Sequence, residues 1–254
     1  MYRLRLLGTG NAAGMPVYGC DCSYCSACET DPERRRRPCS ALLTIDEKQY
    51  LIDAGIVNLH AHFPAGSLEG ILITHFHPDH VQGLFHLRWG KNLQIPVFIP
   101  PDSEGCADLF KHPGILEFRK QKKYQSFLLG DVRVTPLPLI HSKPTFGYLL
   151  ECPDWSIAYL TDTKGLPPST ERYLAERQLD SLIVDCSYAP GYEGKGHNNL
   201  DDVVAIQAQL LAKQVVLTHI GHDFDVWLSC HRECLPDAFI VAYDDYDVTA
   251  GLAR

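Results

Sequence analysis

Short apolar runs recur along the whole sequence, and glycine, proline or aspartate bounds most of them. The runs are rich in valine, isoleucine, leucine and tyrosine, a composition typical of β-strands. We expect strands at residues 2–8, 40–46, 49–55, 70–75, 95–100, 124–130, 132–141, 146–152, 156–162, 181–187, 214–220 and 239–245.

Segments with helical spacing of apolar residues lie between several of these runs, at residues 78–90, 102–112, 167–178, 198–214 and 223–234. The clearest is 198–214, where Asn198 or Asn199 can cap the first turn. Paired strands come early in the chain, and strand–helix alternation dominates later. Two packed sheets with helices on their outer faces would bury this pattern. Because no linker-like segment interrupts it, we expect residues 1–254 to form one α/β domain.

Composition narrows the class of protein. The chain has 254 residues, of which 45% are hydrophobic, as in ordinary soluble globular proteins. Its formal net charge of −8 argues against a nucleic-acid partner. We expect no membrane span, because the sequence has no run of about eighteen apolar residues. The N-terminus is an alternating strand followed by glycines rather than a secretion signal, so we expect a cytoplasmic protein. There the ten cysteines would be thiols or metal ligands rather than disulfides.

Residues 71–83 read ILITHFHPDHVQG and place three histidines and an aspartate directly after a buried strand. Alternate residues of an extended chain point the same way, so His75 and His77 can face one point. Asp79 and His80 begin the next helix and can face a second point nearby. A solvated turn is the simpler explanation for a single histidine. Four ligand-type side chains at one strand end instead favour a site for two metal ions.

Ligand-type residues also end three later strand-like runs: His141, Asp162 and His219. Functional residues commonly gather at the carboxyl ends of strands in α/β folds. A carboxylate can bridge two cations and offset part of their charge, so Asp162 is the candidate bridge. Neutral imidazoles with carboxylates suit zinc, manganese or iron.

The motifs THFHPDH, LIDAG, PLIHS, YLTDT and VLTHIGH together resemble the metallo-β-lactamase superfamily over nearly the whole chain. The resemblance implies a four-layer αββα sandwich with two metal ions at its edge and Asp162 as their bridge. It also implies that Asp53, in LIDAG, orients a ligand through a hydrogen bond; an ordinary turn aspartate is the alternative. The implied ligands are His75, His77 and His141 for one ion, and Asp79, His80 and His219 for the other.

A second group of ligand-type residues lies near the N-terminus, where GCDCSYCSAC contains Cys20, Cys22, Cys25 and Cys28. Tetrahedral thiolate coordination of a structural zinc ion is the natural interpretation. A redox-active dithiol is the alternative. The fourth zinc ligand stays open between Cys28, which is close in sequence, and His222 in the distant THIGH motif.

These two features together resemble the cyclic phosphate phosphodiesterase family of the bacterial carbon–phosphorus lyase pathway for phosphonate degradation. GCDCSYC, RRPCS, DHVQGLF, LRWG, DLFKHPG and VTPLPLIHSKPTFGYLLE carry the resemblance. It implies a structural zinc ion in a small loop at about residues 20–28, with Cys20, Cys22, Cys25 and His222 as ligands. It also implies manganese, or zinc, as the two catalytic ions, and a homodimer.

Two cations about 4 Å apart would lower the pKa of a bridging water toward about 7, and the resulting hydroxide would attack phosphorus. The departing alkoxide needs a proton, so we expect a general acid on the opposite side. The resemblance places this group at His197, in GKGHNNLDD; a helix-entry histidine without chemistry is the alternative. Lys143 is the candidate phosphate contact, and we expect the RRRR run at 34–37 to be a solvated face.

The resemblance implies hydrolysis of 5-phospho-α-D-ribosyl 1,2-cyclic phosphate to ribose 1,5-bisphosphate, with side activity on 2′,3′-cyclic nucleotides. The partner would then be a small phosphorylated substrate, with neither a membrane nor nucleic acid involved. A tRNA 3′-processing endonuclease shares the superfamily site, but it needs a long basic arm and this sequence is acidic. A non-enzymatic metal-binding module is the third alternative, and the metal ligands alone do not exclude a thioester hydrolase.

Overall fold

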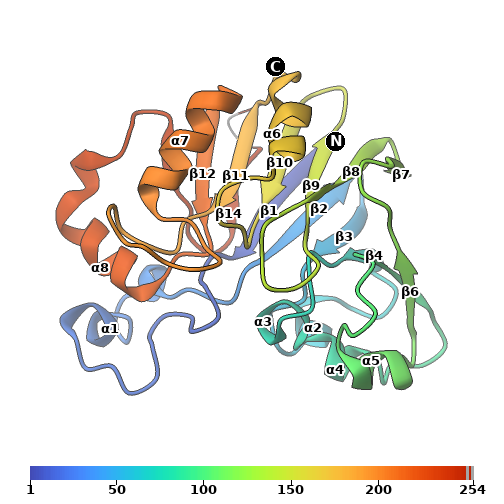
Figure 1. Ribbon diagram of the computed structural model, residues 1–254. Helices are drawn as coiled ribbons and strands as arrows, with labels where there is room; N and C mark the ends of the chain where they lie inside the picture. Colours follow the sequence, from blue (N-terminus) through green and yellow to red (C-terminus); the bar gives the residue numbers. More distant parts are fainter. Residues whose placement is uncertain (250–251, 253–254) are drawn as a thin grey trace.

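The computed structural model describes residues 1–249 and 252, and its strands form two seven-stranded sheets within those residues (Figure 1). The first sheet has the order β14–β1–β2–β3–β4–β5–β6, and the second has the order β13–β12–β11–β10–β9–β8–β7. In the first sheet the bounds are β1 Tyr2–Gly8, β2 Ser40–Ile45, β3 Lys48–Ile52, β4 Leu68–Leu72, β5 Ile95–Ile99, β6 Leu116–Lys120 and β14 Tyr246–Asp247. In the second they are β7 Phe127–Leu129, β8 Val132–Pro138, β9 Phe146–Glu151, β10 Ser156–Leu160, β11 Ser181–Asp185, β12 Gln214–Thr218 and β13 Phe239–Val241.

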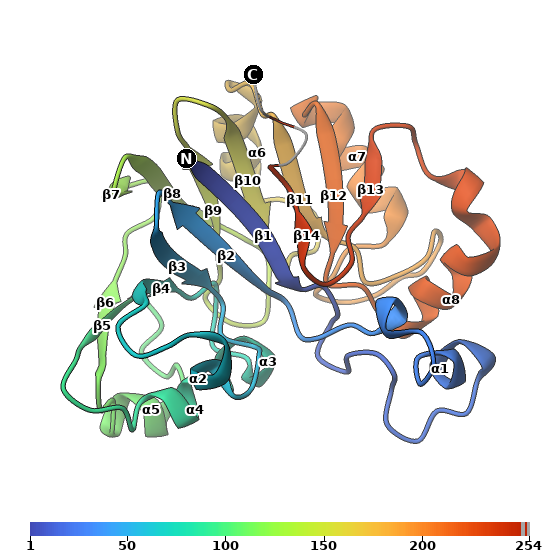
Figure 2. The ribbon, with the colours of Figure 1, turned by 180° about the vertical axis from the view of Figure 1, so that it is seen from behind.

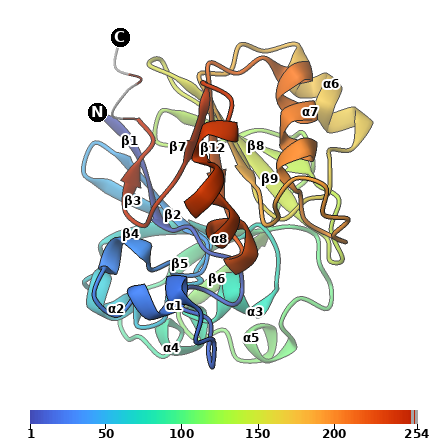
Figure 3. The same ribbon diagram turned by 90° about the vertical axis from the view of Figure 1, so that its left-hand side faces the viewer.

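The helices separate into two outer layers and one N-terminal loop (Figure 1). The first sheet is covered by α2 Leu59–His62, α3 Pro78–Val81, α4 Leu84–Leu87 and α5 Ala107–Lys111. The second is covered by α6 Pro168–Ala175, α7 Leu200–Leu210 and α8 His222–His231. The short elements α1 Ser23–Ala27, η1 Pro32–Arg34 and η2 Arg232–Cys234 complete the described chain. Figure 3 shows the sheets edge-on, with α7 on one side and α2 on the other.

Three apolar layers hold this arrangement together. The central layer joins the two sheets through side chains such as Leu43 and Tyr148. One outer layer packs Val203 of α7 against the second sheet, and the other packs Leu84 of α4 against the first. The strands feed two layers at once because successive side chains alternate between faces. On β2, for example, Leu43 enters the central layer while Leu42 enters the outer one. The four-layer αββα prediction is therefore confirmed.

The direction of the strands decides where their carboxyl ends meet. In the first sheet β3 is parallel to β4. In the second, β10, β11 and β12 are mutually parallel, and β8 runs the same way because both β8 and β10 are antiparallel to β9. Chain segments that leave these strands therefore emerge at common edges of the sandwich, and the residues that follow the strands are brought together there. From behind, β1 and β2 run through the centre of the molecule (Figure 2).

Every segment predicted as a strand overlaps an observed strand, and every segment predicted as a helix overlaps an observed helix, although β3, β4 and α8 begin one or two residues earlier than predicted. Two strands, β6 and β14, and the short helices α1 and α2 were not predicted from the sequence. The predicted helix 78–90 is divided into α3 and α4, with Gly83 between them. A β-carbon at Gly83 would lie 2.4 Å from the carbonyl oxygen of Ile56, so the chain turns here by packing backbone against backbone.

The open choice of cap for the longest helix is settled. Asn199 is the N-cap of α7, and its side chain and that of Asp202 form a reciprocal capping box. Asn198 instead donates its side-chain amide to Asp185. Among the described residues, every helix is too short or too polar to cross a membrane.

One buried hydrogen bond joins the two sheets directly beneath the histidine motif. The hydroxyl of Tyr148, on β9, donates to the carbonyl oxygen of Ile73, just after β4, at 2.7 Å. We expect Tyr148→Phe to lower the free energy of unfolding by about 1–2 kcal/mol, because this carbonyl loses its buried donor. Urea denaturation followed by circular dichroism measures the change.

Tyr159→Phe is the matched control. Its hydroxyl is also buried, but within the described residues its hydrogen-bond partner is a thiol, Cys39 Sγ, at 3.5 Å. This variant should lose less stability than Tyr148→Phe. Equal losses in the two variants would contradict the role given to the bond between the sheets.

Candidate functional site

The structure brings all seven residues predicted as metal ligands to one edge of the sandwich, in two adjacent groups. They come from chain segments that follow β4, β8, β10 and β12, so both sheets contribute. The first group contains His75, His77, His141 and Asp162, and the second contains Asp79, His80 and His219.

In the first group, three imidazole nitrogens face one another. His77 Nδ1 lies 2.8 Å from His75 Nε2 and 3.0 Å from His141 Nε2. Asp162 Oδ1 lies 3.8 Å from the Nε2 atoms of both His75 and His141. The predicted common orientation of His75 and His77 is therefore observed.

In the second group, Asp79 Oδ2 lies 3.4 Å from His80 Nε2 and 3.7 Å from His219 Nε2. Asp162 reaches this group as well. Its Oδ2 is 3.2 Å from His80 Nε2, and its Oδ1 is 3.5 Å from His219 Nε2. Asp162 is thus the residue that contacts both groups, the position required of a bridging carboxylate.

Hydrogen bonds fix the orientation of the imidazoles. Of the five imidazoles among the seven predicted ligands, four donate a hydrogen bond from Nδ1 to a neighbouring oxygen. This leaves the lone pair on Nε2 directed at the cluster. The fifth, His77, is reversed: its Nδ1 faces the cluster, and its Nε2 lies 3.2 Å from Ser142 Oγ. The four acceptors are Thr74 Oγ1 for His75 (3.1 Å), Asp53 Oδ2 for His80 (2.8 Å), Gly196 O for His141 (3.1 Å) and Ser187 Oγ for His219 (3.0 Å).

Asp53 is fully buried and supports the cluster from below. Besides accepting from His80, it accepts from the backbone N–H and the hydroxyl of Thr74, both at 2.8 Å. The sequence left Asp53 open between an orienting residue and an ordinary turn aspartate. These contacts match the orienting alternative.

Three residues at this edge have left-handed backbone conformations that side chains other than glycine rarely adopt. Asp53, Asp162 and His219 have φ values of 58°, 62° and 54°. Each such residue costs about 1–3 kcal/mol, and such strain persists where the surroundings over-determine it. Asp53 and His219 directly follow β3 and β12, and Asp162 lies two residues after the end of β10. The unusual turn therefore aims each side chain toward the cluster instead of continuing the strand direction.

Two observations test whether these residues fit metal ions. Apart from the 3.2 Å ion pair between His80 Nε2 and Asp162 Oδ2, these two atoms and His219 Nε2 are buried and have no hydrogen-bond partner within the described chain. Buried polar atoms without partners are unfavourable and rare. Imidazole nitrogens and carboxylate oxygens are also the usual ligands of zinc and manganese. The residues present therefore fit divalent cations at both groups.

The pKa directions of three imidazoles and two carboxylates agree with this fit, whereas His80 differs: burial alone would lower its pKa, but the carboxylates of Asp162 and Asp53 raise it well above the usual range. Burial lowers the pKa of His75 well below its usual range, and it lowers the pKa of His77 and His141 as well. Burial alone would raise the pKa of Asp79 and Asp162, but the adjacent imidazoles hold both well below the usual range. Neutral imidazoles and ionised carboxylates are the forms that bind cations.

His197, the predicted general acid, lies beside the cluster. Its ring stacks on that of His219 with 4.7 Å between centroids, and its Nδ1–H donates to Asp185 Oδ2 at 2.8 Å. Asp185 is fully buried, and Asn198 donates to its other carboxylate oxygen at 2.8 Å. Within the described residues His197 Nε2 has no hydrogen-bond partner. Asp185 was not predicted from the sequence. The same signal that identified Asp162, an aspartate at the end of an apolar strand-like run, was present at Asp185, the last residue of SLIVD.

The loop around α1, which carries the cysteines, lies next to α8 (Figure 2). Ligand atoms of Cys20, Cys22, Cys25 and His222 lie within 4.8 Å of one another. His222 Nε2 is 3.5 Å from Cys20 Sγ and 3.3 Å from Cys22 Sγ. The backbone N–H of Cys25 and the His222 imidazole lower the pKa of Cys22 to about 6, which favours the thiolate that binds metal. Cys28 is turned away, toward the carbonyl oxygens of Tyr24 and Arg34.

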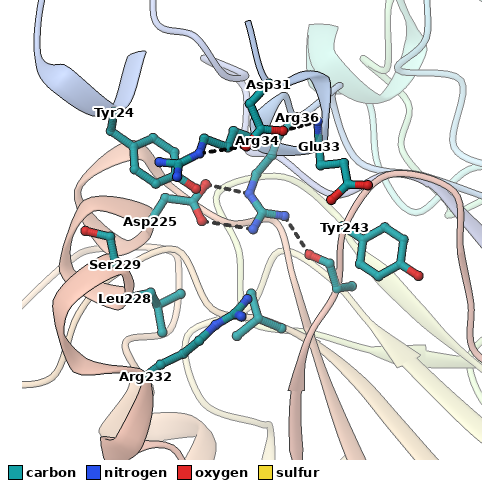
Figure 4. Close-up of a pocket in the computed structure, with 12 residues that line it drawn as sticks. Tyr24, Asp31, Glu33, Arg34, Arg36, Asp225, Leu228, Ser229, Arg232 and Tyr243 are labelled. Atoms are coloured by element: carbon teal, nitrogen blue, oxygen red, sulfur yellow. Dashed lines mark hydrogen bonds and ion pairs between the residues drawn. The ribbon is translucent and has the colours of Figure 1, made fainter. Parts of the chain in front are cut away.

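The arginine run at 34–37 corrects one expectation, because it is only partly a solvated face. The side chain of Arg36 is 8% exposed and forms a bidentate ion pair with Asp225 on α8, at 2.5 and 2.9 Å (Figure 4). Arg36 also donates to Thr9 Oγ1 and Ala242 O, both at 2.7 Å. This residue therefore ties the cysteine loop to α8, beside a cavity of about 570 Å³. Composition alone could not separate it from its exposed neighbours.

Comparison with known proteins adds three relatives. A solved structure described as a new diphosphatase from the PhnP family is 29% identical, with a TM-score of 0.80 and coverage of 97% of this chain and 96% of that one. An octanoyltransferase of Porphyromonas gingivalis is 28% identical over 95% of this chain, but the match spans only 50% of that protein. A ribonuclease Z of Methanopyrus kandleri is 27% identical over 66% of this chain and 57% of its own length.

The family match agrees with the geometry of the site. The family described as the beta-lactamase superfamily domain matches residues 48–220. This span contains both histidine–aspartate groups and His197, whereas the cysteine loop and His222 lie outside it. The motifs predicted a sandwich of two sheets with these side chains at one edge, and the structure has that arrangement. The chain belongs to the metallo-β-lactamase superfamily of metal-dependent hydrolases.

Proposed function

We propose that the two histidine–aspartate groups hold two divalent cations, manganese or zinc. The ligands would be His75, His77 and His141 for one ion, Asp79, His80 and His219 for the other, and Asp162 between them. We further propose that Cys20, Cys22, Cys25 and His222 hold a structural zinc ion within a single domain.

The proposed reaction is hydrolysis of a small cyclic phosphodiester, with 5-phospho-α-D-ribosyl 1,2-cyclic phosphate as the substrate and ribose 1,5-bisphosphate as the product. The observation that carries it is the pair formed by His197 and Asp185 next to the cluster. With its Nδ1–H held by Asp185, the imidazolium form of His197 would carry on Nε2 the proton that hydrolysis of an alkyl phosphodiester requires at the leaving oxygen.

When bound, the cations would activate water and offset the charge of phosphoryl oxygens. The protein's own residues would do the rest. Asp185 holds the His197 ring by its Nδ1–H, so that the opposite nitrogen can carry the transferred proton. Asp53 and Ser187 keep His80 and His219 in the orientations that face the cluster.

A diphosphatase is the second candidate, because the relative with that description is 29% identical over 97% of this chain. Its reaction would also be hydrolysis at phosphorus, but with a phosphate as the leaving group. Such a leaving group is less basic than an alkoxide and depends less on a proton donor. The strength of the requirement for His197 therefore helps to separate the two candidates.

An RNA-processing activity has less support. Relatives named ribonuclease Z match 66–87% of this chain at 19–27% identity, below the 29% of the diphosphatase structure, and the chain's net charge of −8 opposes binding of a polyanion. We also propose that the protein is a cytoplasmic homodimer that acts on small molecules, because the family that its sequence resembles implies this.

Phosphorus NMR of the manganese-loaded protein tests the substrate. With the ribosyl cyclic phosphate we expect the cyclic diester signal to be replaced by that of a phosphomonoester. A dinucleoside diphosphate incubated in parallel reports on the second candidate. Turnover of the diphosphate alone would reject the cyclic phosphodiesterase in favour of a diphosphatase.

His197→Ala tests the general acid. We expect turnover of the cyclic phosphodiester to fall by roughly a hundredfold or more, because the leaving oxygen loses its proton donor. Metal content, measured by elemental analysis, should stay at the parent value. His112→Ala, on the surface, is the control and should retain parent activity. Loss of metal in His197→Ala would instead identify His197 as a ligand, and unchanged turnover would remove it from the mechanism.

His222→Ala and Cys28→Ser together test the zinc site. We expect His222→Ala to lose one zinc ion per chain and to unfold at lower temperature, because ligand loss uncouples the cysteine loop from α8. Cys28→Ser should keep its zinc, since its thiol faces carbonyl oxygens. Elemental analysis and thermal denaturation give both readouts. Zinc retained in His222→Ala but lost in Cys28→Ser would reverse the assignment.

A further inference from the structure

A second pocket adjoins the catalytic cluster and is not used by the chemistry described so far. Its volume is about 450 Å³, and His77 forms part of its wall. The segments 101–104 and 142–144 form the rest. Ser142 Oγ lies 3.2 Å from His77 Nε2, so the pocket is continuous with the ligand set through this pair. A substrate whose reacting phosphorus lies at the cluster would extend into this space.

The lining has the chemistry of a sugar phosphate site. Its one ammonium group belongs to Lys143, and Ser103 and Ser142 contribute hydroxyls. None of the described residues that line it is phenylalanine, tyrosine or tryptophan, so the pocket offers no aromatic platform of that kind for a nucleobase. Lysine is a usual partner of phosphate in proteins.

Asp102 provides a second, independent observation. It is 3% exposed and lines the pocket. Its Oδ1 accepts from the backbone N–H groups of Glu104 and Gly105, at 2.9 and 2.8 Å. Its Oδ2 has no hydrogen-bond partner within the described chain. A buried carboxylate oxygen in this state lacks a donor, and the hydroxyls of a sugar are donors of the right kind.

We propose that this pocket binds the phosphorylated sugar half of the substrate, with the Lys143 ammonium meeting a second phosphate remote from the reacting one. This inference rests on the proposed phosphodiesterase function and refines it. The site selects substrates with a second phosphate on a sugar over cyclic nucleotides, whose base would occupy the same space without an aromatic partner. Asp102 and Glu104 repel an anion placed beside them, so the phosphate belongs at the lysine and the hydroxyls at the carboxylate.

The test compares two substrates that differ only in the second phosphate: 5-phospho-α-D-ribosyl 1,2-cyclic phosphate and α-D-ribosyl 1,2-cyclic phosphate. The parent enzyme should prefer the first in kcat/KM. We expect Lys143→Met to reduce that preference by about ten- to hundredfold, the usual effect of losing a charge-assisted contact. Lys48→Met, at the start of β3, is the matched control and should keep the parent preference. A preference within twofold of the parent in Lys143→Met would overturn the proposal.

A binding measurement separates this inference from the proposed reaction. Isothermal titration of the metal-loaded protein with ribose 5-phosphate and with ribose does not depend on turnover. We expect the phosphate to strengthen binding in the parent and to do so about tenfold less in Lys143→Met. If neither cyclic substrate is hydrolysed but this difference appears, the reaction is wrong and the pocket stands. Equal binding of ribose 5-phosphate by parent and Lys143→Met removes Lys143 from the site whatever the reaction.

Discussion

The whole site depends on the buried carboxylate of Asp162. It is 1% exposed, and it lies within 4 Å of imidazole nitrogens from both groups. A charge so far from water is unfavourable unless it is paired. Here the imidazoles and, in our proposal, two cations would compensate it. The left-handed backbone at Asp162, with φ of 62°, is part of the same constraint, because a residue continuing the strand would not reach the cluster.

The sandwich supplies what this interaction needs. Its three apolar layers fix strands of both sheets, so side chains that are far apart in sequence are held next to one another at one edge. The hydroxyl of Tyr148 bonds the second sheet to the backbone of the first directly before the histidine motif. The cysteine loop stabilises the segment that follows β12. His222 lies three residues after His219, and the buried pair of Arg36 and Asp225 secures the same helix, so the loop helps to position the strand end that carries a ligand.

Much of this could be predicted from sequence, and the failures have physical causes. Strand-ending ligands such as His141 and His219 are visible because a polar side chain after an apolar run stands out. Arg36 could not be separated from the other arginines, because its burial depends on Asp225, which is 189 residues away. Asp185 was overlooked because its partner, His197, is brought to it only by the fold. The strand β6, LEFRK, lacks clear alternation, and its edge position explains why charged side chains are tolerated there.

Anomalous X-ray diffraction from crystals of the metal-replete protein tests the central claim most directly. The account predicts two metal peaks at the edge of the sandwich, roughly 3.5–4 Å apart, with Asp162 in contact with both. It also predicts a separate zinc peak among Cys20, Cys22, Cys25 and His222. A single peak at the histidine cluster, or two peaks without Asp162 between them, would contradict it.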